Sequence, residues 1–365
     1  MQKYAITAIA LLTFATPAYS QIGALQRRAG QLQKISDIHF SDAEERDLGA
    51  KVSAQLRQRY GVVQDAKVTK YVSLVGTVLA KASSRPGLAW QFIVLDTDAV
   101  NAYAAPGGII HITRGALGLI KSEAELAGVL AHEIAHVTEK HTIKAIQKAK
   151  GIEAGVDLAN KGAVADLFAG KAYEMVFENA FDRGDELGAD KTGVQMTGKS
   201  GYSATGLSAF LQRLAERNKN VKEPNGLFAS HPLIKERTDK IASEAARIKP
   251  PATATVQARY ASHISYKPVP LSAVATIAPP AGVKAAAPEA KAAPKPDAKK
   301  KPSLGVGRLR AALSTGTEKQ STQVSASAGA RGVGPDRDAK GGPSKNAVTV
   351  RITDAELAAF KAGIA

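Results

Sequence analysis

The sequence predicts a mainly helical α+β fold with a small antiparallel sheet, followed by a low-complexity linker and a small C-terminal strand-helix unit. Apolar residues recur at helical spacing over much of residues 41–250, and a segment rich in β-forming residues interrupts them at 89–113. Proline, alanine and lysine dominate residues 279–302, a composition that buries too little apolar surface to fold. The 365 residues are 44% hydrophobic, which is enough for a sizeable core.

Two helices are expected first. Ser41 and Glu44 have the spacing of a capping box, in which each side chain satisfies the free backbone N–H of the other residue, and helical apolar spacing continues through Leu56. A second helix is predicted at residues 66–82, where valines and leucines recur on one face. We expect both helices to pack against the segment that follows.

The sheet is predicted from three short segments, at residues 89–95, 100–104 and 109–113. A turn-like Asp-Thr-Asp sequence at 96–98 separates the first two, and Gly107-Gly108 precedes the third. We therefore predict a small, largely antiparallel sheet.

Helices are expected to dominate the rest of the folded region. Ser122 and Glu125 form a second possible capping box, which places the start of a helix there. Further helices are predicted at residues 172–196 and 205–217, and from His231-Pro232 onward, because proline suits a first helical position. Two interpretations remain open for residues 151–170, a mobile cover over a functional site or a helical hairpin.

The first twenty residues predict a secretory signal peptide. Lys3 precedes an apolar run that is too short to span a bilayer, and small residues at Ala18 and Ser20 suit a cleavage site. The mature chain is then expected to be exported, periplasmic and without a transmembrane span. An uncleaved anchor is the alternative. We divide the remaining chain into a folded domain at 21–250, a linker at 251–303 and a basic tail at 304–365.

The tail is expected to end in a small ordered unit. Alternating valines and an isoleucine at 348–352 predict a strand, and Thr353-Asp354 can cap a helix that presents Leu357, Phe360 and Ile364. This unit is too small to be stable alone. It therefore needs a partner surface, either on its own folded domain or on another protein.

Charge is concentrated in the C-terminal third. From residue 251 onward there are 17 Lys and Arg against 7 Asp and Glu, within a chain whose net charge is +16. This excess suggests weak contact of the tail with anionic envelope surfaces, although a merely soluble linker explains it equally well. Export and the lack of interleaved aromatic residues argue against nucleic acid as a partner.

The segment around residues 126–137 carries the chemistry. It reads HEIAH at 132–136, and two histidines four residues apart lie on one helical face, where both rings can bind one metal ion. Glu133 then stands beside a water polarised by the metal and can take its proton. The chain has no cysteine, so zinc ligands must come from His, Asp and Glu. An amphipathic helix with surface histidines is the alternative.

A hydrolytic zinc site needs a third protein ligand, and Glu186 is the best candidate. Asp190 follows four residues later on the same helical face, where it can accept the second N–H of a ligating histidine. Taken singly, each of these acids is better explained as a solvated helix charge. Their spacing after the HEIAH motif favours the metal interpretation.

These motifs resemble those of the gluzincin metallopeptidases that include the CAAX prenyl protease, HtpX and the periplasmic BepA-like proteases. The matching pieces are NAYAAPGG at 101–108, HEIAH at 132–136, ELGAD at 186–190 and HPLIKER at 231–237, and together the resemblance covers about residues 40–250. It implies a zincin-type metallopeptidase domain that binds one zinc ion per chain. By resemblance, His132, His136 and Glu186 bind the metal, Glu133 is the general acid and base, and Asp190 supports His132.

The resemblance also implies roles for two later residues. His231 would stabilise the transition-state oxyanion or close the site as a fourth ligand, and Arg237 would orient His231 or the oxyanion. From the sequence alone, His231 is better explained as a helix-capping surface histidine, because His-Pro suits a helix start. His141 is left outside the ligand set, and His39 and His111 are expected to be surface or packing residues.

The segment Asn101, Ala102, Tyr103 and Ala104 corresponds to the family's substrate strand at the edge of the sheet. A polypeptide substrate would pair with it through backbone hydrogen bonds, with loose side-chain specificity. The alternative is an interior strand with an ordinary turn at 106–108.

Two departures limit this resemblance. The chain has no spanning helix like those of the prenyl protease and HtpX, and it lacks the helical repeats of BepA-like proteins. We therefore expect a periplasmic zinc endopeptidase that acts on unfolded or misassembled envelope proteins. A chaperone or assembly factor with a latent or structural zinc site is the alternative, and an anchoring role concerns the tail.

Overall fold

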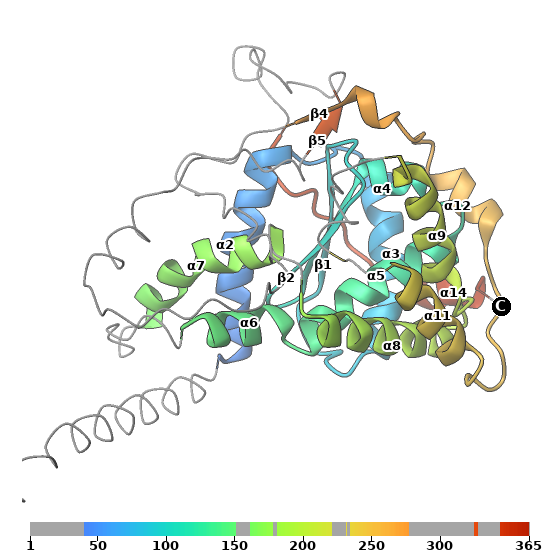
Figure 1. Ribbon diagram of the computed structural model, residues 1–365, viewed down its shortest axis with the longest axis horizontal. Coiled ribbons are helices and arrows are strands. Elements are labelled where there is room, and N and C mark those ends of the chain that lie inside the picture. The colour runs from blue at the N-terminus through green and yellow to red at the C-terminus, as the bar shows by residue number, and fades with distance from the viewer. Residues whose placement is uncertain are drawn as a thin grey trace, which may run out of the picture.

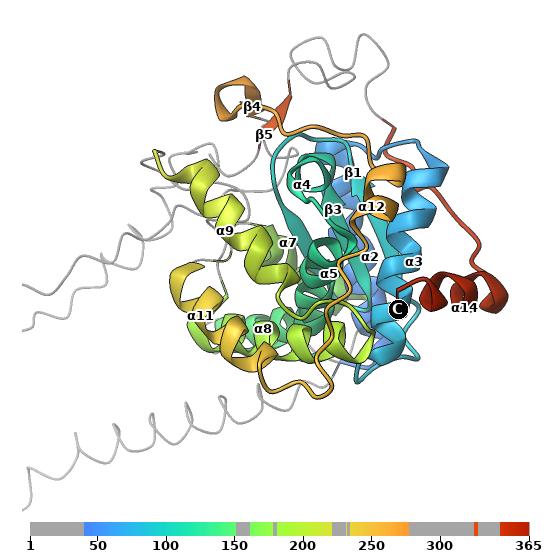
Figure 2. The same ribbon diagram turned by 90° about the vertical axis from the view of Figure 1, so that its right-hand side faces the viewer.

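The computed structural model describes residues 40–150, 161–177, 181–220, 231, 234–276, 325–327 and 344–364. A small sheet lies at the centre, with helices on both sides (Figures 1 and 2). The predicted signal peptide, His39 and most of the predicted linker and tail lie outside the described residues. Among the described residues, no helix has both the length and the apolar character that a membrane span requires.

The sheet contains β1 (Gln91–Leu95), β2 (Ala102–Ala105) and β3 (Ile109–Thr113) in the order β1-β3-β2. The predicted α+β fold is confirmed, but the sheet is mixed: β3 is antiparallel to β2 and parallel to β1. The antiparallel prediction assumed that consecutive strands pair. Instead, the tight turn through Gly107 and Gly108, both at positive φ, folds β3 back between β1 and β2.

Side chains that alternate along the strands divide the core in two. Phe92 and Val94 of β1 point into one apolar cluster, and Ile93 and Leu95 point into the other. The first cluster contains α3 (Ala66–Ala82), α5 (Glu123–Thr138) and α9 (Gly206–Asn218). The second contains α2 (Asp42–Tyr60), α6 (His141–Lys150) and α7 (Lys161–Phe177). The sheet is therefore covered by helices on both faces.

Several predicted helices are confirmed. The capping box of Ser41 and Glu44 begins α2, and α3 spans the predicted residues 66–82. Ser122 caps α5 by accepting from the Glu125 N–H, but the Glu125 carboxylate accepts from the Lys121 N–H and pairs with Arg213. The second capping box is thus only half formed.

The single helix predicted at 172–196 was wrong. Two helices occupy this region, α7 and α8 (Arg183–Lys199). Phe181 lies between them, and its ring stacks on that of His136 at a centroid distance of 4.2 Å. Residues 181 and 182 are not helical, and the Phe181 side chain packs against the functional site.

The remaining elements complete the body. They are α4 (Arg114–Leu119), α11 (Ile234–Ala245), α12 (Gln257–His263), η1 (Leu271–Ala273), β4 (Val274–Thr276), β5 (Ser325–Ser327) and α14 (Asp354–Ala362). Tyr260 and Ile264 belong to the first core cluster. The folded body therefore continues beyond residue 250, the boundary that the sequence suggested.

The C-terminal unit lies against the chain's own body. Thr353 and Glu356 form the capping box of α14, and Leu357 and Ile364 are buried in the first core cluster. No strand is assigned to residues 348–352. Of the two partner surfaces that the sequence left open, the structure shows the one on the same chain.

Candidate metal centre

The site is built on α5 and α8, which pack closely together. Gly193 of α8 has no side chain, and a Cβ at this position would lie 3.1 Å from the backbone nitrogen of His132. Glu186 and Asp190 precede Gly193 by seven and three residues, so they lie on the same face of α8. This close approach brings both carboxyl groups against the histidines of α5.

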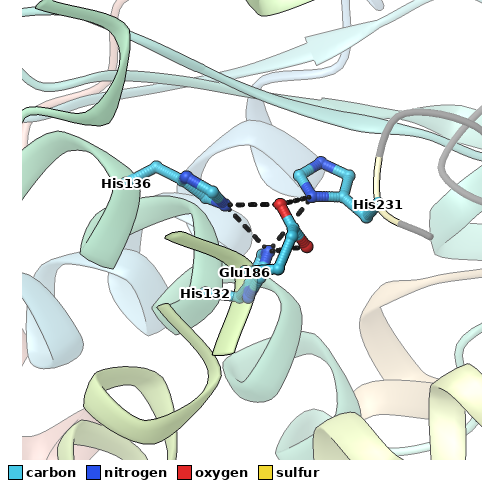
Figure 3. A group of neighbouring side chains, drawn as sticks. All are labelled: His132, His136, Glu186 and His231. Atoms are coloured by element: carbon cyan, nitrogen blue, oxygen red, sulfur yellow. Dashed lines mark hydrogen bonds and ion pairs between the residues drawn. The ribbon is translucent and has the colours of Figure 1, made fainter. Parts of the chain in front are cut away.

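Four buried side chains converge in the site: His132, His136, Glu186 and His231 (Figure 3). The Nε2 atom of His132 lies 3.0 Å from His136 Nε2 and 3.3 Å from His231 Nδ1. A Glu186 oxygen lies 3.5 Å from His136 Nε2 and 2.8 Å from His231 Nδ1. Ligands of a tetrahedral zinc ion at roughly 2.0–2.1 Å are about 3.3 Å apart, so this spacing fits a zinc site.

His132 is held from behind by a carboxylate. Its Nδ1 lies 2.9 Å from Asp190 Oδ1, and Arg237 donates to both oxygens of Asp190 from Nε and Nη2, each at 2.7 Å. All three side chains are buried. Because the His132 Nδ1–H donates a hydrogen bond to Asp190, the lone pair of His132 lies on Nε2 and points into the cluster.

His136 is held by His141, which the sequence did not place in the ligand set. His136 Nδ1 lies 2.9 Å from His141 Nδ1, and His141 Nε2 lies 3.2 Å from Glu139 Oε2. The Glu139 carboxylate accepts a hydrogen bond from the His141 Nε2–H. The Nδ1 atom of His141 then carries a lone pair that accepts a hydrogen bond from the His136 Nδ1–H. The Nε2 lone pair of His136 then also points into the cluster.

These hydrogen bonds test whether a metal fits. They leave the lone pairs of His132 Nε2 and His136 Nε2 facing one another across 3.0 Å. Two neutral acceptors at this distance repel one another unless a cation lies between them. With the carboxylate of Glu186 beside them, neutral imidazoles and one negative oxygen are the donor set that a catalytic zinc site uses. The residues therefore fit zinc.

Glu133 is placed as the resemblance implied, next to the cluster. Its side chain is buried, its Oε1 accepts no hydrogen bond from the described residues, and His231 Nε2 lies 3.8 Å from that oxygen. Burial raises the pKa of Glu133, although His231 and His132 oppose this shift. A carboxylate with a raised pKa and one oxygen that accepts no hydrogen bond from the described residues is suited to exchange protons with a reacting molecule.

The neighbouring pKa values follow from burial and charge. Burial alone would raise the pKa of Glu186 and of Asp190, but His231 lowers the first and Arg237 lowers the second. Burial lowers the pKa of His136 well below its usual value. His231 differs, because Glu186 raises its pKa against the effect of burial.

Arg237 contacts the site from the side of Asp190. It pairs with Asp190, lies 2.9 Å from Glu186 Oε2, and donates from Nη1 to the backbone carbonyl of His231. It therefore contacts His231 through the backbone carbonyl of that residue, and its role in orienting His231 or the oxyanion stays a prediction. Burial would lower its pKa, but the pairing with Asp190 raises it and keeps the guanidinium charged.

The predicted substrate strand lies at one edge of the three-stranded sheet, as residues 102–104 of β2. Asn101 precedes it, and its carbonyl accepts from the Thr113 N–H at 3.0 Å. Because antiparallel pairs alternate, the N–H and C=O groups of Ala102 and Ala104 then point away from β3. The side chains of all four residues are buried.

Comparison with known proteins identifies related sequences. Residues 66–245 match the model of peptidase family M48. The beta-barrel assembly-enhancing protease of Yersinia pestis is 27% identical over 228 residues, which cover 59% of this chain and 46% of that protein. Its counterpart in Escherichia coli strain K12 is 25% identical over 225 residues, which cover 58% and 46% of the two chains.

A eukaryotic relative also matches. The mitochondrial metalloendopeptidase OMA1 of Schizosaccharomyces pombe is 27% identical over 176 residues, 47% of this chain and 52% of that protein. The chain thus spans about half the length of these relatives. All four buried residues of the cluster lie within residues 66–245, the part of the chain that the family model matches.

Proposed function

We propose that the chain, which matches the model of peptidase family M48 through residues 66–245, is a zinc-dependent endopeptidase that cleaves unfolded or misassembled envelope proteins. The observation that carries this proposal is the convergence of His132, His136 and Glu186 beside Glu133, whose Oε1 accepts no hydrogen bond from the described residues. Three protein ligands and a neighbouring general base are the arrangement that metal-assisted peptide hydrolysis requires.

His132, His136 and Glu186 would hold the zinc ion. When bound, the ion supplies Lewis acidity, which lowers the pKa of water and polarises the scissile carbonyl. Glu133 takes a proton from the attacking water as the oxygen adds to the carbonyl carbon. It delivers that proton to the amide nitrogen as the C–N bond breaks, which leaves a carboxylic acid and an amine.

Asp190 and Arg237 act behind the ligands. Asp190 fixes the tautomer and the orientation of His132, and Arg237 neutralises the two buried acids, Asp190 and Glu186. Removing the guanidinium of Arg237 would leave two carboxylates in the interior without their charged partner, which is strongly destabilising. Arg237 is therefore a positioning residue.

The outer edge of β2 is the proposed substrate site. The carbonyl of Ala102 and both backbone groups of Ala104 point away from β3 and can pair with an extended peptide, whereas the Ala102 N–H donates to Asn101 Oδ1 at 2.9 Å. Such pairing places little demand on side chains and requires an unfolded stretch of substrate. This requirement supports unfolded or misassembled proteins as the substrate class.

His231 supports a second candidate function. Its Nδ1 atom lies among the ligand atoms, 3.3 Å from His132 Nε2 and 2.8 Å from Glu186 Oε1. A fourth protein ligand closes the open position that catalysis needs. Contact with Glu186 raises the pKa of His231 against the effect of burial and favours the protonated ring, which can donate to an oxyanion. A closed site is what a chaperone or assembly factor with latent zinc would show.

The periplasm is the proposed location. The sequence of the first twenty residues supports export, and two of the relatives are named as proteases that enhance β-barrel assembly. The basic tail is proposed to contact anionic envelope surfaces weakly. Measuring envelope retention of the chain with and without residues 277–343 tests that contact, and equal retention would exclude it.

The proposed activity is tested with zinc-loaded protein and unfolded casein. Replacing Glu133→Gln should retain zinc and fold but lower the cleavage rate by about 10²–10⁴-fold, the usual contribution of a general base. Cleavage at the parental rate would exclude Glu133 as the base. Comparing His231→Ala with the parent separates the two candidates, since inactivity of both at full zinc occupancy favours the binding role.

A further inference from the structure

The last described segment of the chain, residues 344–364, runs along the surface of the body. The backbone carbonyl of Ser344 accepts from the Val62 N–H at 2.7 Å, and that of Lys345 accepts from Arg57 Nη1 at 2.7 Å. Further along, Glu356 pairs with Lys70 and Asp354 pairs with Lys81 at 3.2 Å. These contacts lay α14 across α3, as Figure 2 shows.

Apolar side chains fix the segment more firmly than these exposed ion pairs. Leu357 is 7% exposed and Ile364 is 2% exposed, and both belong to the core cluster that contains α5. Ile352 and Phe360 pack against the same cluster. Burial of two aliphatic side chains stabilises a contact more than exposed ion pairs do, because water screens the charges. The segment is therefore part of the folded body.

The core beneath α14 contains a buried carboxylate at the first residue of α5. Glu123 is fully buried and accepts from Tyr71 Oη at 2.8 Å, Tyr202 Oη at 2.7 Å and Arg259 Nε at 2.7 Å. The guanidinium of Arg259 also pairs with Glu123 through Nη2. A buried charge of this kind persists only while its partners remain in place.

Phe360 of α14 lies against two of these three partners. Its ring is 4.1 Å from the guanidinium carbon of Arg259, and its backbone carbonyl accepts from Arg259 Nη1 at 3.1 Å. The same ring makes an edge contact with Tyr71 at a centroid distance of 6.1 Å. Arg259 is thus held between Glu123 and the C-terminal end of α14.

We propose that residues 344–364 form an intramolecular clamp that fixes the N-terminal end of the metal helix α5, with Phe360 and Arg259 as positioning residues. α14 shields the Arg259–Glu123 pair from water, which strengthens the attraction between the two charges. His132 lies nine residues after Glu123 on one continuous helix, so a shift at Glu123 moves both ligating histidines.

The opposite end of α5 is held by a different part of the chain. Arg85 donates from Nη1 to the Val137 carbonyl at 3.2 Å and pairs with the buried carboxylate of Glu45 at 2.8 Å. The metal helix is thus fixed at its C-terminal end by α2 and the residues after α3. At its N-terminal end, Glu123 is held by Tyr71, Tyr202 and Arg259, and of these Arg259 is the one that donates to the backbone of α14.

The clamp is tested in the full-length, zinc-loaded chain with Phe360→Ala. Lys361→Ala is the matched control, because Lys361 is exposed on the same helix. We expect amide hydrogen exchange at residues 124–129 and the rate of zinc release to a chelator both to rise about three- to thirtyfold, the range that loss of a cation–π contact gives. In an Arg259→Gln background the same substitution should add no further change, because its route to α5 is already broken.

Exchange and zinc release equal to those of the Lys361→Ala control would overturn the clamp. Equal effects of Phe360→Ala in the parent and Arg259→Gln backgrounds would overturn the route through Arg259. If Phe360→Ala lowers the unfolding temperature of the whole chain, Phe360→Leu is used with the same two criteria. None of these measurements depends on proteolysis, so they remain decisive even if Glu133→Gln shows that the proposed activity is wrong.

Discussion

Asp190 accepts from His132 and from Arg237 through a single carboxylate, with Oδ1 shared between His132 Nδ1 at 2.9 Å and Arg237 Nη2 at 2.7 Å. Three N–H groups from these two residues point at two oxygens. Asp190 of α8 and Arg237 of α11 therefore hold the ring of His132 with its Nε2 atom toward the metal centre.

Asp190→Asn should weaken zinc binding by about 10–100-fold, the usual effect of losing a residue that orients a ligand. An amide has one oxygen, so its NH₂ group must face an N–H of Arg237 or of His132 inside the protein. Competition with a chelator measures the affinity. Asp239→Asn is the control, because Asp239 is an exposed residue of α11, and equal affinities of the two variants would contradict the role of Asp190.

His141 should matter through the atom it offers to His136. His141→Asn keeps an acceptor near the position of Nδ1, whereas His141→Leu removes it, so the leucine variant should bind zinc about 10–100-fold more weakly and the asparagine variant should bind nearly normally. Zinc dissociation constants are measured on samples whose circular dichroism matches the parent. Equal weakening in both variants would show that His141 acts by packing alone.

The sequence predicts the contact of Asp190 with His132, but it does not predict the contact of His141 with His136. Glu186 and Asp190 follow from helical spacing once the histidine motif is recognised. The contact from His141 depends on Lys140, whose φ of 58° reverses the chain between α5 and α6. Lysine has no particular preference for that conformation, so local sequence gives no indication that His141 returns to His136.

The errors in the fold have a similar cause. Alternation along β1, β2 and β3 predicts which faces are buried, but it carries no information about which strand lies in the middle. The parallel pairing of β1 with β3 depends on that order. Likewise, the amphipathic pattern of α14 predicts that it needs a partner, while the choice of α3 depends on Lys70, Lys81 and Arg259, which lie far from it in the sequence.

Acid should destabilise the body through a histidine outside the metal centre. Burial lowers the pKa of His111 to about 3, and its Nε2 lies 2.9 Å from Ser53 Oγ. The unfolded chain binds this proton near pH 6.5, so the stability contributed by the neutral ring is present above that pH and decreases as the pH falls toward the folded value.

The expected loss attributable to His111 is about 1.4 kcal/mol per pH unit below pH 6. His111→Gln retains a group that can bond Ser53 but cannot be protonated, so its free energy of unfolding should fall less steeply with acid. Urea denaturation of zinc-free protein between pH 7 and 5 measures both slopes. Identical slopes in parent and variant would mean that His111 is not the titrating group.

Backbone pairing at the edge of β2 predicts a pattern in the substrate itself. A peptide that adds to the sheet beside Ala102 and Ala104 points every second N–H toward β2 and the others away. N-methylation should therefore lower kcat/KM by roughly 2–12-fold at alternate positions near the cleaved bond, the range of one lost hydrogen bond, and have little effect at the positions between. Cleavage rates of a methylation series on one peptide give the pattern. A loss that does not alternate, or that follows side-chain identity instead, would place the substrate away from this edge.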